Sequence, residues 1–180
     1  MQLVRDRLRR TITVSQPGYL EDLREDFGLT STVGPMTPMV DKPREPESDV
    51  NPLLDAAGIK MYQRKVGSVL WPAMGTRPEV QLAVNLHSRY TKSPLRGDMV
   101  TLDRVLDYLV HTPELGLILG GHGGVRLWAT VDASYGTHED RKSHTGCTLH
   151  IGDGSGAFLS RSKKQTVTAD SSTVAEFIAT

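Results

Sequence analysis

The sequence predicts an α+β fold, in which a helical region precedes three antiparallel strands and a final helix. Two observations carry this prediction. Between residues 62 and 111, apolar side chains recur at the three- and four-residue spacing of amphipathic helices. After Pro113 the pattern changes to short apolar runs separated by glycine and polar residues, which is typical of strands joined by short connections.

The N-terminal residues are expected to form two short strands and a helix. Residues 1–5 and 11–15 have the composition of strands, the second being rich in β-branched side chains. Pro17 suits the first turn of a helix, and Gly28 is placed to end it. The apolar side chains of this helix recur along one face, at Leu20, Leu23 and Phe27.

A proline-rich segment over residues 30–50 shows neither helical nor strand periodicity and is expected to be a linker. Beyond it, the pattern is helical from Tyr62 to His111, and Val66, Val69 and Leu70 share one face before Pro72. Thr76 and Glu79 have the spacing of a capping box that would open the next helix. A further apolar stripe predicts a helix that ends before Pro113, and it consists of Leu102, Val105, Leu106 and Leu109.

The last third predicts strands at 125–131, 147–151 and 158–162, followed by a helix at 171–180. The glycine-rich residues 120–124 precede a strand and lack a G-K-[ST] sequence, so a tight turn is preferred to a phosphate-binding loop. His144, Cys147 and His150 are spaced by three, but residues three apart on a strand point to opposite faces. A zinc site at these residues is therefore not expected.

Composition limits the classes of function. The 180 residues suffice for one domain or two small ones, and the 21 basic and 21 acidic side chains cancel. The single cysteine, Cys147, excludes an intrachain disulfide framework. No apolar run approaches the ~20 residues that cross a bilayer, so we expect no membrane partner and an intracellular protein, with cytoplasm and nucleus unresolved.

Two carboxylates and two basic clusters are the candidate functional groups. Asp132 follows an apolar strand, where it could be a metal ligand or the first residue of a turn. Glu176 could bind a metal or complete a capping box with Thr173. The first basic cluster consists of Arg5, Arg7, Arg9 and Arg10, and the second consists of Arg161, Lys163 and Lys164. Each cluster could contact a phosphate backbone or simply be solvated.

Several ordered blocks of the chain together resemble one family. The blocks are LVRDRLRRTITVSQPGYLEDLREDFGL, TPM, YQRKVGSVLWPAMGTRPEVQLAVNLHSRY, DRVLDYLVHTPELGL, VDASYG, EDRKSHTG and SKKQTVTADSSTVAEFIA. They resemble the C-terminal part of copia-type retrotransposon Pol polyproteins, where reverse transcriptase runs into ribonuclease H. The resemblance covers nearly the whole chain, and SKKQ followed by SST-x-AE is its most specific part.

The resemblance implies four segments. Residues 1–40 would be the end of reverse transcriptase, 41–58 a proline-rich linker, 59–113 a helical connection, and 114–180 an incomplete ribonuclease H-like domain with a mixed sheet. In the family, Mg²⁺ ions bound by carboxylates cleave the RNA strand of an RNA–DNA hybrid. Asp132 and Glu176 occupy the first two of these ligand positions, so they are the expected catalytic and metal-binding residues.

The chain also departs from the family pattern. Counterparts of two further carboxylates and of the polymerase Y-x-D-D strand are absent from these residues, and Ser134 and Val174 replace acidic residues common in relatives. We therefore expect little or no hydrolysis by this chain alone, and an unpaired edge on strand 125–131 that favours association or marginal stability. The alternative is a non-catalytic nucleic-acid-binding remnant of a decayed element. The remainder of the polyprotein, where expressed, would be a partner.

Overall fold

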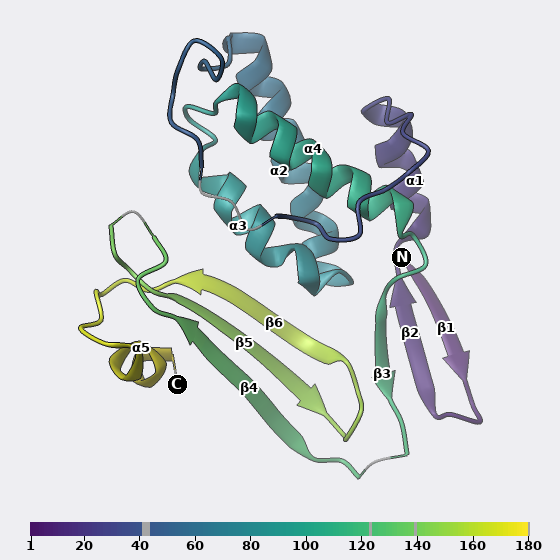
Figure 1. Ribbon diagram of the computed structural model, residues 1–180. Coiled ribbons are helices and arrows are strands. Elements are labelled where there is room, and N and C mark those ends of the chain that lie inside the picture. Colours follow the sequence, from purple (N-terminus) through teal and green to yellow (C-terminus); the bar gives the residue numbers. More distant parts are fainter. Residues whose placement is uncertain (41–43, 123, 139, 180) are drawn as a thin grey trace. The chain divides into compact units, whose positions relative to one another are not determined.

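The computed structural model describes residues 1–40, 44–122, 124–138 and 140–179. Residues 41–43 of the expected linker, Gly123, Glu139 and Thr180 lie outside the described residues. The described chain divides into a helical unit, made of Met1–Gln2 with Ser15–Gly116, and a sheet unit, made of Leu3–Val14 with residues 117–179. Figure 1 shows the elements of both units. Their mixture of helices and antiparallel strands confirms the predicted α+β class.

The helical unit contains α1 (Pro17–Asp26), α2 (Ala56–Gly75), the short 3₁₀ helix η1 (Pro78–Val80), α3 (Gln81–Arg89) and α4 (Arg96–His111). Helix α4 packs against α1, α2 and α3. The predicted apolar stripe of α4 is completely buried in this core, because its spacing keeps these side chains on one face. The other helices contribute further buried side chains to this core, including Leu20, Leu23, Tyr62, Val69 and Val84.

Helix α2 differs from the prediction at its C-terminal end. Pro72 lies inside the helix and is buried, and its carbonyl accepts hydrogen bonds from the backbone N–H groups of Thr76 and Arg77. Thr76 ends α2 instead of capping the next helix, and its hydroxyl donates to Gln16 Oε1 at 2.8 Å. The expected capping box is therefore wrong. Glu79 instead accepts a hydrogen bond from the buried side chain of Arg77.

The proline-rich segment has little regular structure, but side chains attach its described part to the helical unit. The guanidinium of Arg44 forms an ion pair with Asp98 at 2.7 Å. Asn51 Oδ1 accepts from Gly97 N at 2.7 Å. Asp55 caps α2 by accepting from Gly58 N at 2.7 Å, so the helix begins at Ala56.

The first sheet has the order β1 (Gln2–Asp6), β2 (Thr11–Ser15) and β3 (Leu117–Gly120). The sequence predicted the two N-terminal strands but missed β3, which runs antiparallel to β2. Gly120 has φ +94, and a Cβ there would lie 2.5 Å from the carbonyl oxygen of Arg10. Glycine is thus required where this strand ends.

The second sheet has the order β4 (Leu127–Ser134), β5 (His144–Ile151) and β6 (Ala157–Lys164), and α5 (Ser172–Ala179) follows it. All pairings are antiparallel, which confirms the predicted three strands and helix. The strands are longer than expected, so Asp132 lies inside β4 rather than at its end. The Asp132 side chain is exposed, and a carboxylate in solvent does not interrupt the strand.

Candidate functional site

The candidate site residues lie on the β4–β5–β6 sheet and on α5. In the register of the sheet, Asp132 faces Gly146, and Gly146 faces Ser162. Because side chains alternate along a strand, Asp132 lies on the same face as Trp128 and Thr130. Val131 and Ala133 lie on the opposite face and are half-buried.

Asp132 is an exposed carboxylate in an otherwise uncharged strand. Among the residues that the structure describes, its side chain has no hydrogen bond or ion pair. Asp132 therefore lies within β4 and is not the first residue of a turn. Its oxygens remain accessible to a ligand.

Glu176 lies in α5, which packs against β4 and β5 through the buried Ala175. The N-terminus of this helix is capped by Ser171, whose hydroxyl accepts from Val174 N at 3.2 Å. The predicted capping box of Thr173 and Glu176 is thus replaced by a cap two residues earlier, at Ser171. Glu176 is exposed, and its carboxylate is not used for capping.

The side chain of Gln165 joins α5 to the sheet. Its amide Nε2 donates to Thr145 Oγ1 at 3.0 Å and to the carbonyl oxygen of Ala175 at 2.9 Å. Thr145 faces Ala133 in the register, so this attachment is on the face opposite to Asp132. Helix α5 is thus attached on the face of the sheet opposite to Asp132, and no contact joins the carboxylates of Asp132 and Glu176 among the described residues.

The three basic residues predicted to contact nucleic acid are divided between the two faces. Arg161 and Lys163 alternate with Ser162 along β6 and share the face of Cys147 and Thr145. Lys164 lies on the face of Asp132, where its Nζ forms an ion pair with Asp140 Oδ2 at 2.6 Å. This hydrogen bond lowers the pKa of the Asp140 carboxyl. The three therefore do not form a single basic patch.

The sequence did not predict the contacts that two histidines of β5 make on the Asp132 face. His144 Nε2 lies 2.7 Å from Ser162 Oγ, and its Nδ1 lies 3.1 Å from His138 Nε2. The ring of His150 stacks on Trp128 with centroids 4.0 Å apart. Cys147 lies on the other face, as strand alternation predicted. Strand alternation alone would have placed both β5 histidines on one face.

In the part of the chain that the structure describes, no three His, Cys, Asp or Glu side chains come close enough to hold a metal ion. A two-metal site requires about four carboxylates. Asp132 and Glu176 alone do not meet this requirement.

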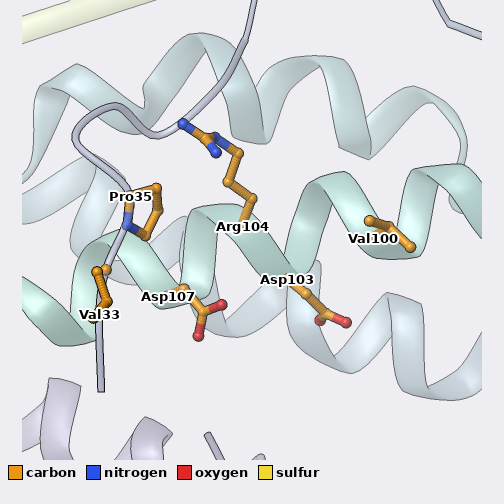
Figure 2. A pocket seen from close by; sticks show the side chains of 7 residues that line it. Val33, Pro35, Val100, Asp103, Arg104 and Asp107 are labelled. Carbon is orange, nitrogen blue, oxygen red and sulfur yellow. The ribbon is translucent and has the colours of Figure 1, made fainter. Parts of the chain in front are cut away.

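A hollow in the helical unit lies between α4 and the segment at Val33–Pro35, as Figure 2 shows. Its charged lining residues are Asp103, Arg104 and Asp107. Asp103 is already paired with Lys65 at 2.5 Å, and Arg104 Nη2 donates to Thr37 Oγ1. None of the predicted site residues lines this hollow.

Comparison with known proteins relates the chain to transposon sequences. It is 29% identical over 182 residues to the retrovirus-related Pol polyprotein from transposon TNT 1-94 of Nicotiana tabacum, covering 99% of the chain and 14% of that protein. It is 31% identical over 165 residues to the Pol polyprotein from transposon RE1 of Arabidopsis thaliana, covering 91% and 11%. The chain thus spans a small fraction of these polyproteins.

A shorter relative is covered over most of its length. The secreted RxLR effector protein 161 of Plasmopara viticola is 34% identical over 119 residues, which are 66% of the chain and 82% of that protein. No family model matches the chain, and no solved structure matches it. Among the described residues, none of the helices has the length and apolar character needed to cross a membrane.

Proposed function

Because the chain belongs to the sequence family that includes the retrovirus-related Pol polyproteins of transposons and RxLR effector protein 161, we propose that it spans the end of a reverse transcriptase and the start of a ribonuclease H. Its substrate in the intact polyprotein would be an RNA–DNA hybrid. The alignment over 99% of the chain with the tobacco polyprotein supports this assignment.

The proposal for the nuclease part rests on the exposed carboxylate of Asp132. It is an exposed carboxylate without a protein partner among the described residues, while the helix of Glu176 is attached to the opposite face of the sheet. A carboxylate kept free in this way is suited to bind a hard cation such as Mg²⁺. We propose Asp132 and Glu176 as contributors to Mg²⁺ binding in the polyprotein.

The described residues do not fit a complete Mg²⁺ site, because they bring no third ligand to these two carboxylates. Bound Mg²⁺ would supply the positive charge that stabilises a leaving oxygen of the RNA. We derive no hydrolytic step from this chain and propose that carboxylates elsewhere in the polyprotein complete the site. The 180 residues alone are then expected to bind a hybrid without cutting it.

The test is a cleavage assay with a labelled RNA–DNA hybrid and Mg²⁺, run on the 180-residue chain and on a longer Pol segment that contains it. We expect turnover only by the longer segment and its loss in Asp132→Asn. Asp153→Asn is the matched control, since Asp153 is an exposed carboxylate in the turn between β5 and β6. Full activity of Asp132→Asn would reject the role of Asp132.

A second candidate is a nucleic-acid-binding remnant without catalysis. The observation that favours it is the exposure of four arginines on the β1–β2 hairpin, at Arg5, Arg7, Arg9 and Arg10. Phosphate contacts by these side chains would make binding salt-dependent, with a slope of about 0.9 per contact on duplex DNA. Salt-dependent binding that Arg5→Gln with Arg7→Gln weakens, together with no turnover by the longer segment, would favour this candidate.

A further inference from the structure

Three hydroxyl side chains of the helical unit are followed directly by proline in the sequence, and they belong to Thr37, Ser93 and Thr112. Proline keeps the residue before it extended. A serine or threonine in this setting is the substrate of the proline-directed class of protein kinases, which bind an extended segment. The structure separates the three candidates by what holds each of them.

Two of the three are engaged in contacts of the fold. The hydroxyl of Thr112 accepts a hydrogen bond from Nη2 of the buried Arg77 at 2.7 Å. After Ser93, the ring of Pro94 is buried, and the carbonyl of Pro94 accepts from Leu54 N at 3.0 Å. A kinase would have to break these contacts before it could bind either sequence.

Thr37 is accessible without such a rearrangement. It is exposed and lies in the segment 30–40, which contains neither helix nor strand. Side chains of α4 hold this segment: Arg104 Nη2 donates to Thr37 Oγ1 at 3.2 Å, and His111 Nε2 lies 2.9 Å from the carbonyl oxygen of Ser31. Because backbone ladders are absent from residues 30–40, the segment can be taken up in extended form while the helices stay packed.

The guanidinium beside Thr37 has a donor to spare. Nε of Arg104 is buried and has no hydrogen-bond partner among the described residues, which is unfavourable for a polar group. A guanidinium presents its N–H groups in a planar fork that matches phosphate oxygens. In the view of Figure 2, the Arg104 side chain extends from α4 in the opposite direction to the carboxylates of Asp103 and Asp107. Arg104 is therefore placed to receive an anion at Thr37.

We propose that Thr37 is a phosphorylation site for a proline-directed protein kinase, and that its phosphate clamps the segment 30–40 onto α4 through Arg104. This inference does not rest on the proposed function. The Thr37 oxygen forms a bond to the γ-phosphorus of ATP, the bond from this phosphorus to the β–γ bridging oxygen breaks, and ADP leaves. The hydroxyl proton passes to the carboxylate base of the kinase.

The modification exchanges weak contacts for stronger ones. The hydroxyl of Thr37 loses the hydrogen bond that it donates to the carbonyl of Met39 at 3.1 Å. In return, the guanidinium of Arg104 donates charge-assisted hydrogen bonds to phosphate oxygens, in place of a neutral one to the hydroxyl. The segment 30–40 is therefore held more tightly against α4 after phosphorylation.

The first test locates the phosphate. The folded 180-residue chain is incubated with a purified proline-directed kinase, ATP and Mg²⁺, and its peptides are sequenced by mass spectrometry. We expect phosphate on Thr37 and its loss from this position in Thr37→Val. Ser93→Ala is the matched control, since Ser93 is also exposed, and it should leave the rate at Thr37 unchanged. No phosphate on Thr37, or faster incorporation at Ser93 or Thr112, would overturn the proposal.

The second test measures the clamp by hydrogen exchange of the amides in residues 30–40, before and after phosphorylation. Exchange should slow about tenfold in wild type and stay unchanged in Arg104→Gln. Arg96→Gln, an exposed arginine of the same helix, is the control and should keep the full slowing. Arg104→Lys retains the charge without the fork and should lose most of the slowing, which decides the matter if Arg104→Gln does not fold. Unchanged or faster exchange in phosphorylated wild type, or full slowing in a folded Arg104 variant, would overturn the clamp.

Discussion

The hydroxyl oxygen of Tyr62 lies 2.9 Å from Nδ1 of His87, inside the core of the helical unit. Both side chains are buried, and their rings meet edge to face with centroids 6.0 Å apart. Burial lowers the pKa of His87 to about 4 and raises that of Tyr62. The imidazole is therefore neutral in the folded protein at pH 7.

We expect the unfolding free energy of the helical unit to fall as the pH falls, because of His87. Its folded pKa lies below the unfolded value, so its contribution is complete above about pH 6.5 and declines as the pH falls towards 4. The full difference between the unfolded and folded pKa of His87 corresponds to about 3 kcal/mol of unfolding free energy. Denaturant unfolding at pH 7.5, 6 and 5, monitored by helical circular dichroism, should show this decline in wild type. His87→Gln should flatten it, whereas the exposed His122→Gln should leave it unchanged.

The buried guanidinium of Arg77 is expected to stabilise the end of α2. It donates to the carbonyl of Thr112 at 2.9 Å and to its hydroxyl at 2.7 Å, and it pairs with Glu79. Arg77→Met leaves the Thr112 carbonyl without this donor and should cost about 2 kcal/mol of unfolding free energy. Glu79→Gln should cost less unfolding free energy, since Glu79 is half-exposed and Arg77 still donates its hydrogen bonds to Thr112. Equal losses of unfolding free energy in the two variants, measured by chemical denaturation, would contradict this account.

Gln165 is expected to control the attachment of α5. Replacement by leucine removes both hydrogen bonds of its Nε2 at a cost of about 1 kcal/mol each. Hydrogen exchange should then show faster exchange in α5, while the amides that join β4 and β5 stay protected. Thr166→Val, at an exposed neighbouring position, is the control. Unchanged exchange in α5 would show that Ala175 packing alone holds the helix.

Lys164 and Lys163 should differ in their effect on Asp140. Lys164 holds the pKa of the Asp140 carboxyl below its ordinary value, while strand alternation directs Lys163 to the other face. In an NMR titration, Lys164→Gln should raise the pKa of Asp140 and Lys163→Gln should leave it unchanged. A similar rise in both variants would mean that general charge, and not the specific pair, sets this pKa.

Features set by neighbouring residues could be predicted from the sequence. The buried stripe of α4 and the β-branched strand at Thr11–Ser15 depend on local periodicity, and both were found. Strand β3 was missed because its four residues pair with β2, about a hundred positions earlier. Thr76 was expected to cap the next helix, but it ends α2 and donates to Gln16, which lies 60 positions earlier in the chain.

The candidate site was predictable only in part for the same reason. Local residues left the roles of Asp132 and Glu176 open, the resemblance to Pol polyproteins singled them out, and their contribution to a metal site remains a prediction. The distribution of Arg161, Lys163 and Lys164 over two faces follows from strand alternation, once β6 is known to extend to Lys164. The contact of His144 with Ser162 requires the register between β5 and β6, which the spacing of residues does not give.

The packing of α1 against α4 makes residues on both sides of the proline-rich segment parts of one folding unit. Arg24 Nη2 donates to the carbonyl of Val110 at 2.6 Å, and Leu20 and Leu23 are buried in the same core as Leu109. A protease that cuts the backbone within residues 30–40 would therefore yield two fragments that stay bound and elute together. Separately produced fragments should likewise reassemble when mixed.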